Sequence, residues 1–475
     1  MAASGERPNF LFIIGEDTGR YLACYGDPVA QTPHLDRLAS EGCRFDQAWT
    51  TSPVCAPSRS ALVTGQYPMK IGTHHMRSRL LDPPRLFTHE LRDAGYHVSW
   101  PTKLDFNLDP TEGWRDDDEM WQDRLRSGDL PDKPWLLYQN IGITHESTMW
   151  PDEGQGESRP RSWFLQFEPR PPRQTDPDAV PLPDYLPDTP AVREDIARHY
   201  DNIAELDRQM GGILDALAAS GQAENTFVIF LADHGRGLPR EKRWPYAPGL
   251  RMPLIVRGPG IEAGSTRDEL VSWTDIAPTI LSLAGAEIPE SYDGQVFLGP
   301  DADEPRKYVF GGRDRMDEAF DRVRVVSDGE WLYVRNFYPQ IPYAQRLKYI
   351  EHLPTMQELR RLRAAGQLAG SDALFMQETK PEEELYDLRL DARCVNNLAD
   401  DPVARGRRDR LSAALERWIE EIGDLGGVPE RELIERGLVE DQITGHRQSL
   451  EPLSPEHRIG PELTVVEPGD LEDGQ

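Results

Sequence analysis

One cysteine occupies a position where a thiol could take part in chemistry. The stretch SPVCAPSRSALVTGQYP, residues 52–68, places Cys55 in a short polar turn directly before a predicted helix. A thiol there can be structural, can be a nucleophile whose pKa the helix N-terminus lowers, or can bind a metal. Position alone favours the structural reading. The other cysteines, Cys24, Cys43 and Cys394, follow no pattern, so free thiols in a reducing compartment are expected.

Further residues suited to chemistry come directly after apolar stretches. The stretches PNFLFII, KPWLLYQNIGI and NTFVIFLADHG end in polar residues, which are Glu16 and Asp17, His145, and Asp233 and His234. Stretches that are apolar on both faces predict buried strands covered by helices. In open sheets of this kind, ligands bind beyond the carboxyl ends of the strands. These polar residues are therefore candidate site residues.

Helical stretches separate the predicted strands. In TPHLDRLASEGCRF, residues 32–45, apolar residues recur at helical spacing, with Thr32 as a cap and Gly42 as a stop. Residues 188–221 are a long amphipathic stretch that we expect to break near Gly211 and Gly212. A further strand is predicted in MPLIVRGPG. This order predicts an α/β fold with a large mixed sheet flanked by helices on both faces.

The pattern changes near residue 300. KYVFGGRD, DRVRVVSDGEWLYVRN and EELYDLRLD resemble short antiparallel strands, and ARGRRDRLSAALERWIEEIG resembles a closing helix. We expect residues 1–300 to form the catalytic α/β domain and 301–430 a smaller C-terminal α+β domain built on a short antiparallel sheet. Residues 431–475 are predicted to be a polar tail. The Pro-, Asp- and Arg-rich segment 151–188 reads equally as a surface excursion or as the wall of a substrate cleft.

The charge of the chain limits its partners. The 475 residues include 53 basic and 82 acidic ones, which gives a net charge of −29. Such a field repels nucleic acid and anionic membrane surfaces, so neither is an expected partner. An anionic substrate would need local positive charge at its site. No signal peptide or spanning segment is recognised, and a cytoplasmic location is predicted.

The full string CAPSR changes the reading of Cys55. It resembles the C-x-P-S-R signature of type I sulfatases, within the alkaline-phosphatase-like superfamily, and SRSALVTGQYP continues the likeness. GEDTGR, TPHLDRLASEGCRFDQAW, ADHG, MPLIVRGPG and TDIAPTILSLAG resemble further landmarks of the family in the expected order. The likeness covers roughly residues 8–400. PLPDYLPDTPAVREDIARHYDNIAELDRQMGGIL is most similar to the sulfamidase (N-sulfoglucosamine sulfohydrolase) branch.

The resemblance implies a modification of Cys55. In the family a formylglycine-generating enzyme oxidises this cysteine to an aldehyde, formylglycine, and Pro57 and Arg59 would be part of what that enzyme reads. The hydrated aldehyde is a geminal diol, of which one hydroxyl attacks sulfur and the other expels sulfate. Arg59 would later hold the diol and steady the metal carboxylates.

The resemblance also implies a divalent cation. Its ligands would be Glu16, Asp17, Asp233 and His234, together with the modified Cys55. Ligation rich in oxygen favours Ca²⁺, with Mg²⁺ or Mn²⁺ as alternatives because His234 adds a nitrogen. The family usually has Asp where this chain has Glu16, so the geometry at that ligand must differ.

Three further residues match sulfate-contacting positions of the family. Lys103 and Lys242 resemble its two sulfate-binding lysines, and His145 resembles the histidine that faces the leaving group and protonates it. Two residues beyond Lys103 the family normally has a histidine. Here that position is Asp105, which either takes the proton of the diol or leaves the role vacant.

Candidate substrate residues are expected in two charged stretches. GTHHMRSR follows the signature helix, and within it His74 or His75 is expected to line the pocket, alongside Arg77 and Arg79. In GGRDRMDEAFDRVR, Arg313, Asp314 or Arg315 could reach back to grip a sugar. A solvated strand and turn is the alternative for this stretch.

Together these features predict a hydrolase that cleaves a sulfate ester or sulfamate, with a sulfated sugar as its partner. A phosphonate monoester or phosphodiester hydrolase of the same superfamily and a non-catalytic metal-binding relative remain alternatives. Acyl transfer by an unmodified Cys55 is less favoured, since no histidine and oxyanion partners are evident. Homo-oligomerisation is left open.

Overall fold

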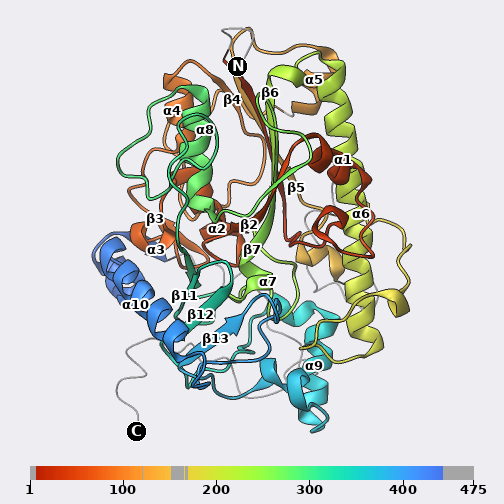
Figure 1. Cartoon of the computed structure of the whole chain (residues 1–475), viewed down its shortest axis with the longest axis vertical. Coiled ribbons are helices and arrows are strands. Elements are labelled where there is room, and N and C mark those ends of the chain that lie inside the picture. Colours follow the sequence, from red (N-terminus) through yellow and green to blue (C-terminus); the bar gives the residue numbers. More distant parts are fainter. Residues whose placement is uncertain (1–6, 120, 151–164, 166–168, 442–475) are drawn as a thin grey trace.

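The computed structural model describes residues 7–119, 121–150, 165 and 169–441 (Figure 1). Within these residues the main sheet has eight strands, in the order β4-β5-β1-β6-β7-β2-β8, with β9 paired to β2. The bounds are β1 (Asn9–Gly15), β2 (Cys43–Trp49), β4 (His97–Ser99), β5 (Trp135–Ile141), β6 (Thr226–Ala232), β7 (Arg251–Arg257), β8 (Ser265–Arg267) and β9 (Val271–Ser272). The predicted mixed sheet is confirmed, because β4, β5, β1 and β6 run parallel and β7 is antiparallel to both β6 and β2.

The apolar residues of β1 explain why both faces of the sheet are covered. Phe10 and Phe12 belong to one core cluster, and Leu11 and Ile13 belong to another. Successive side chains of a strand point to opposite faces, so an apolar strand requires cover on both sides. Figure 1 shows that cover, with α2, α4 and α8 on one face and α1, α5 and α6 on the other. The bounds are α1 (Pro33–Glu41), α2 (Cys55–Thr64), α4 (Phe87–Asp93), α5 (Trp121–Ser127), α6 (Pro190–Ala219) and α8 (Ile276–Ala284).

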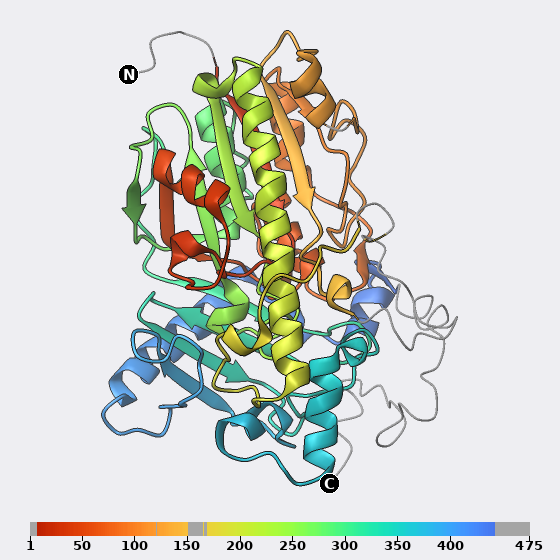
Figure 2. The ribbon, with the colours of Figure 1, turned by 90° about the vertical axis from the view of Figure 1, so that its right-hand side faces the viewer.

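Helix α6 continues through the two glycines where a break was expected. Residues 190–219 form a single helix, so the predicted break near Gly211 and Gly212 is wrong (Figure 2). A Cβ atom on Gly211 would lie 2.6 Å from the ring of His34, next to the packed helix α1. Glycine at this position therefore permits close helix packing and does not interrupt the helix.

A smaller sheet lies beyond the carboxyl ends of the main strands (Figure 2). It is antiparallel in the order β10-β11-β12-β13, as predicted. The bounds are β10 (Val309–Arg313), β11 (Val323–Ser327), β12 (Trp331–Asn336) and β13 (Glu383–Asp387), with helices α9 (Pro354–Ala364) and α10 (Arg405–Ile422). The domain boundary proposed near residue 300 stays a prediction.

Part of the predicted tail belongs to the packed structure. Residues 430–441 contribute α11 (Glu430–Glu435) and β14 (Val439–Asp441), and β14 pairs with β3 (Ser78–Leu80). The prediction of a polar tail from residue 431 is wrong for this part, because Leu433 and Val439 are buried in the main core cluster. Residues 442–475 lie outside the described part of the chain, as does most of 151–168 in the predicted cleft wall.

The ends of three parallel strands lie level with one another. Gly15 of β1 pairs in register with Ile141 of β5 and with Ala232 of β6. The residues that follow these strands therefore meet at one edge of the sheet.

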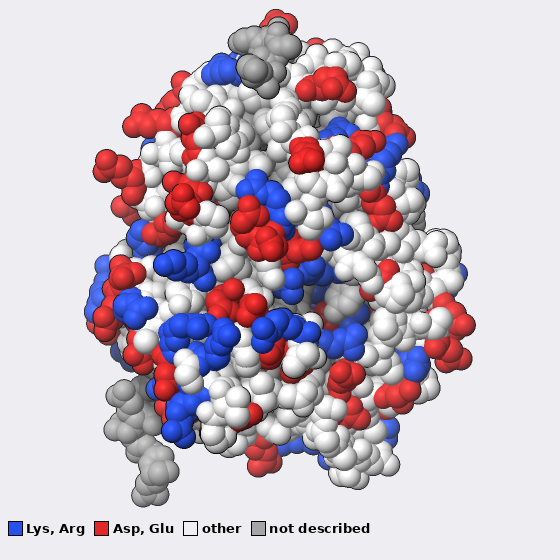
Figure 3. Space-filling view, viewed as in Figure 1, with Lys and Arg blue, Asp and Glu red and all other residues white. Residues whose placement is uncertain are grey.

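The surface is not uniformly acidic. Figure 3 shows Lys and Arg side chains interspersed with acidic ones across the middle of the face it presents. In the described part of the chain, no helix combines the length and apolar character needed to cross a membrane.

Candidate active site

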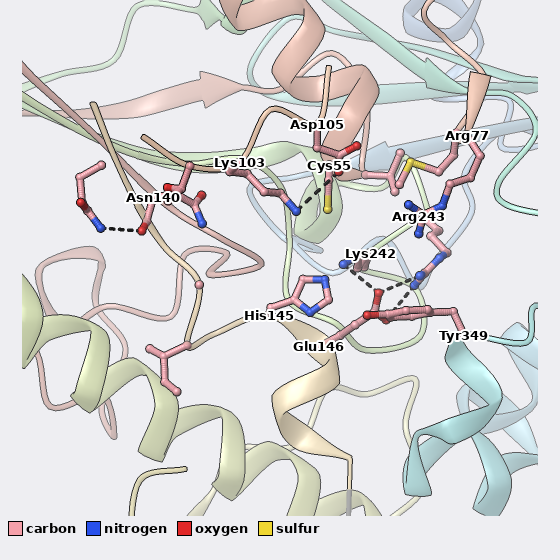
Figure 4. Close-up of a pocket in the computed structure, with 16 residues that line it drawn as sticks. Cys55, Arg77, Lys103, Asp105, Asn140, His145, Glu146, Lys242, Arg243 and Tyr349 are labelled. Carbon is pink, nitrogen blue, oxygen red and sulfur yellow. Dashed lines mark hydrogen bonds and ion pairs between the residues drawn. The ribbon is translucent and has the colours of Figure 1, made fainter. Parts of the chain in front are cut away.

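A cavity of about 680 Å³ opens in front of Cys55 (Figure 4). Its walls come from the ends of the main strands, the start of α2 and a loop before α9. The lining residues are Val54, Cys55, Met76, Arg77, Thr102, Lys103, Asp105, Gln139, Asn140, Gly142, Ile143, His145, Glu146, Lys242, Arg243 and Tyr349. Figure 4 shows Cys55 between Lys103 on one side and Arg77 and Arg243 on the other.

Cys55 is held at the start of a helix, facing the strand ends. It is the first residue of α2, after extended Val54, and is 3% exposed. Its Sγ lies 3.3 Å from Nε2 of His234 and 3.9 Å from Oε1 of Glu16. Burial raises the pKa of the thiol, although Lys242 and Lys103 oppose this. The side chain is thus in contact with the predicted metal ligands and is not packed away in the core.

The residues that could hold a metal form one buried cluster. Their ligand atoms lie within 4.8 Å of one another in two overlapping groups, which are Glu16, Asp17, Cys55 and His145, and Asp17, Cys55, Asp233 and His234. In the described part of the chain, Oδ1 of Asp17 accepts no hydrogen bond although it is buried, and Nε2 of His234 lies 3.2 Å from it. A buried carboxylate oxygen without a donor is costly unless a cation binds it. The donor set, rich in oxygen with one nitrogen, therefore fits a divalent cation.

Burial disfavours the charged form of each residue in the cluster, and the neighbouring charges decide how far each pKa is shifted. Burial raises the pKa of Asp17 to about 7, with Glu146, Asp233 and Glu16 raising it further against Lys242. Burial also opposes ionisation of Glu16, but Lys103 and Arg59 hold its pKa at about 2. Burial lowers the pKa of His234 to about 4, which leaves a neutral imidazole able to donate a lone pair.

The backbone fixes the ligands from several directions. Oδ1 of Asp233 accepts hydrogen bonds from the backbone N–H of Asp17 at 2.9 Å and of His234 at 3.0 Å. The carbonyl of Gly235 lies 2.9 Å from Nδ1 of His234, which leaves Nε2 facing Cys55. A metal-binding histidine is commonly oriented in this way through its second nitrogen.

Arg59 lies behind the cluster and does not line the cavity. Its side chain is 1% exposed, and its Nε and Nη2 atoms lie 3.0 and 2.9 Å from Oδ2 of Asp233. Nη1 donates to the hydroxyl of Tyr138 and Nη2 to Oδ1 of Asn140, both at 2.7 Å. Asn140 in turn donates to Oε2 of Glu16 at 3.0 Å. Arg59 is therefore connected to Asp233 directly and to Glu16 through Asn140.

The predicted sulfate-contacting residues meet at the cavity. Lys103 pairs with Glu16, and its Nζ lies 3.5 Å from Oδ2 of Asp105. The Nζ of Lys242 lies 2.7 Å from Oδ2 of Asp17. Nε2 of His145 lies 3.9 Å from Oε1 of Glu16. The two lysines thus stand beside Cys55 as buried or largely buried cations.

The predicted substrate residues lie elsewhere. The structure places His74, His75, Arg313 and Arg315 outside the cavity lining, buried in other contacts. Nδ1 of His75 accepts from the backbone N–H of Arg315, whose side chain pairs with Glu430. The guanidinium of Arg313 packs over the ring of Trp244, 3.9 Å from its centroid. None of the four residues therefore lines this cavity, contrary to the prediction.

Other residues line the cavity that sequence reasoning did not select. Arg243 makes two hydrogen bonds to the carboxylate of Glu146, at 2.7 and 2.8 Å, and Glu146 also lies 2.8 Å from Nζ of Lys242. The available sequence signal was that Arg243 directly follows Lys242 and that Glu146 directly follows His145. Tyr349 comes from a loop far along the chain and carried no signal at all. Arg77 lines the cavity, whereas Arg79 is at the surface beside Asp109 and Glu440.

Comparison with known proteins identifies the family. Residues 8–286 match the sulfatase family, and the chain is 36% identical over 466 residues to an ulvan-active sulfatase of Formosa agariphila, covering 91% of this chain and 78% of that protein. The chain belongs to the sulfatase family. The present chain is also 28% identical to human N-sulphoglucosamine sulphohydrolase, over 88% of this chain and 90% of the human one.

A solved structure shows the same fold. BT4656, in complex with its substrate D-glucosamine-2-N,6-O-disulfate, matches with a TM-score of 0.63 at 19% identity, over 88% of this chain and 99% of that one. The predictions of the sulfatase family, of the fold and of a sulfuric ester hydrolase are therefore confirmed. The family implies a metal and a formylglycine in general, and the acidic cluster around Cys55 fits both.

Proposed function

We propose that this sulfatase removes sulfate from a sulfated carbohydrate, using formylglycine made from Cys55 and a divalent cation, with Ca²⁺ preferred. The observation that carries the proposal is the position of Cys55 Sγ, 3.3 Å from Nε2 of His234 and 3.9 Å from Oε1 of Glu16, in the wall of a cavity that two lysines also line. Relatives named for ulvan and for N-sulphoglucosamine support a carbohydrate substrate.

The groups that the family implies would sit within this set of residues. Glu16, Asp17, Asp233 and His234 would hold the cation, which supplies charge that polarises a sulfate oxygen and favours ionisation of the nucleophile. Formylglycine, when hydrated, supplies one hydroxyl that attacks sulfur and a second that expels sulfate.

The lysines of this chain stabilise the charge of the substrate. Lys103 and Lys242 pair with Glu16 and Asp17 of the acidic cluster respectively. A cation bound to those carboxylates would compete with both ion pairs and leave each ammonium group able to face the non-bridging sulfate oxygens. Fixed positive charge in a buried cavity stabilises charge that develops in the transition state.

Two residues are placed to move protons. His145 lines the cavity, and its Nδ1 lies 2.8 Å from Oγ of Ser147, which orients the ring. Burial, with Lys242 and Lys103, lowers the pKa of His145 well below its ordinary value, and a bound anionic substrate would raise it again. We propose that Asp105, which lines the cavity beside Lys103, takes a proton from the nucleophile. His145 then delivers a proton to the leaving oxygen or nitrogen.

A panel of substrates tests the function. Purified enzyme would be assayed on N-sulfated glucosamine, on O-sulfated sugars and on an aryl sulfate, against an aryl phosphate diester. Faster turnover of a sulfated sugar supports the proposal and separates S–O from S–N cleavage. Preference for the phosphate diester would instead indicate the phosphonate or phosphodiester hydrolase alternative, and no turnover of any compound by formylglycine-containing protein would indicate a non-catalytic relative. The formylglycine-generating partner, a cytoplasmic location and self-association stay predictions.

A further inference from the structure

Arg77 presents a guanidinium group to the cavity from the side opposite Lys103 (Figure 4). It lies between α3 (Pro68–Ile71) and β3, and its side chain is 33% exposed. Its Nε donates to Oδ1 of Asp317 at 3.0 Å. Within the described part of the chain, neither Nη1 nor Nη2 of Arg77 donates a hydrogen bond. These two nitrogens form the edge with which arginine binds a carboxylate or sulfate.

The other cations around the cavity are already engaged. Arg243 places both of its Nη atoms on Glu146, and Arg59 holds Asp233. Lys103 and Lys242 stand beside the metal ligands, where the sulfate to be cleaved would lie. Among the described cations of this cavity, Arg77 is the one whose donor edge has no protein acceptor.

The backbone around Arg77 is held in an uncommon conformation. In the described part of the chain, eight residues other than glycine have positive φ. Arg77, Lys103 and Arg243 among them line this cavity, and Asp17 and Asp317 contact the lining residues Lys242 and Arg77. The φ angles of Arg77 and Arg243 are both 71° and that of Asp317 is 47°. Such conformations are unfavourable for residues with a side chain and concentrate at functional sites. Arg77 and its hydrogen-bond partner Asp317 share a positive φ with Asp17 and Lys103.

Asp317 serves to orient Arg77. It is 3% exposed, follows β10 of the smaller sheet, and its second oxygen lies 3.6 Å from Nε of Arg243. The carboxylate of Asp317 thus contacts the Nε atoms of both Arg77 and Arg243. The Nη atoms of Arg243 are already hydrogen-bonded to Glu146. Tyr349 also lines the cavity, and the guanidinium of Arg243 lies over its ring, 5.6 Å from the centroid.

We infer that Arg77 binds a second anionic group of the substrate, a carboxylate or a further sulfate on the same or the neighbouring sugar, while Lys103 and Lys242 face the sulfate that is removed. The inference rests on the proposed function. It names the substrate class as carbohydrates with at least two anionic groups. Asp317 is a positioning residue for Arg77.

Binding to protein that cannot turn over tests this inference. In a Cys55→Ala background loaded with Ca²⁺, titration calorimetry would compare two pairs of probes. The first pair is D-glucosamine-2-N,6-O-disulfate against D-glucosamine-6-O-sulfate. The second is a hexuronic acid linked to a sulfated sugar against the same disaccharide with its carboxyl group reduced to an alcohol.

We expect the doubly anionic member of at least one pair to bind at least about tenfold more tightly, which is the scale of a charge-assisted hydrogen bond. Arg77→Gln should reduce that preference to less than about threefold. Arg79→Gln is the matched control, since Arg79 is 35% exposed and stands two residues away outside the cavity, and it should keep the preference. Asp317→Asn should weaken the preference, because Asp317 positions Arg77. Arg77→Lys should show a preference between those of Arg77→Gln and of protein with Arg77, because an ammonium group lacks the paired donors of a guanidinium.

The pair that shows the preference identifies the group, a sulfate or a carboxylate. A preference that persists in Arg77→Gln, or no preference in protein with Arg77, overturns the inference while the proposed function stands. Failure to bind any of the four sugars overturns the proposed function and this inference with it. Urea unfolding of each variant shows whether it is folded under the conditions of the titration.

Discussion

Replacement of Lys242 separates its proposed role in catalysis from its role in the fold. Its side chain is 2% exposed and its Nζ lies 2.7 Å from Asp17 and 2.8 Å from Glu146. Lys242→Met removes the charge and keeps much of the volume. Arg243 still neutralises Glu146 through two hydrogen bonds. Asp17 loses its ion-pair partner but keeps the hydrogen bond from the backbone N–H of Glu146.

The structure allows the size of both effects to be worked out. Breaking a buried ion pair costs about 3–5 kcal/mol, and because only one carboxylate is left unpaired we expect the lower end, about 3 kcal/mol. A bound cation would offset part of this loss. The loss of one charged donor to the transition state should reduce kcat by about 10²–10³-fold.

A second buried lysine provides the control. Lys380 pairs with Asp321 in the smaller sheet region, is 4% exposed and lies outside the cavity. Lys380→Met should lower the free energy of unfolding by a similar amount but leave kcat of the folded enzyme on an aryl sulfate unchanged. Urea unfolding and steady-state kinetics measure the two quantities. An equal fall of kcat in both variants would refute a catalytic role for Lys242.

Two further predictions concern pH and metal. Burial raises the pKa of Asp195 to about 7 against its hydrogen bonds from Thr355, so the folded state holds a proton that the unfolded state releases near pH 3.8. The free energy of unfolding should therefore fall as pH rises from about 4 to 7, by about 4 kcal/mol more than in the Asp195→Asn variant. Urea unfolding at several pH values measures this difference, and parallel pH profiles for the two proteins would contradict the prediction. Removing divalent cations with EDTA should lower the melting temperature of the enzyme. Adding Ca²⁺ at about 100 times its Kd should restore about 2.7 kcal/mol of the free energy of unfolding, which is more than Mg²⁺ or Mn²⁺ restores at equal concentration. Asp17→Asn should show little of this response, and an identical shift in that variant would place the cation elsewhere.

The parts of this molecule that follow from local pattern could be predicted from the sequence. The nearly all-apolar β1 and β6 predicted a sheet covered on both faces, and their carboxyl ends put Glu16, Asp17, Asp233 and His234 at one edge. The position of Cys55 beside them followed from the resemblance to sulfatases and not from spacing.

Features that depend on packing between distant segments could not be predicted. Gly211 was read as a break because glycine disfavours helices, but its value lies in contact with His34, which only the packed structure shows. Strand β2 (Cys43–Trp49), directly after the predicted helix stop at Gly42, was not predicted, because it is formed by pairing with the distant strand β7. His74 and His75 were predicted to line the pocket because of their side-chain chemistry. The local sequence does not show whether the side chains of a turn point into a cavity or into the core, and both residues are buried outside the cavity. The arrival of Tyr349 at the cavity likewise depends on how a remote loop folds back.

The central claim concerns one side chain, and the mass of one peptide tests it most directly. Protein made in a host that contains the formylglycine-generating enzyme would be digested, and the peptide that contains Cys55 would be weighed by mass spectrometry. We expect loss of sulfur and gain of oxygen at Cys55 alone, with Cys43 and Cys394 from the same sample still carrying thiols. A plain thiol at Cys55 in enzyme that turns over a sulfated sugar would contradict the account.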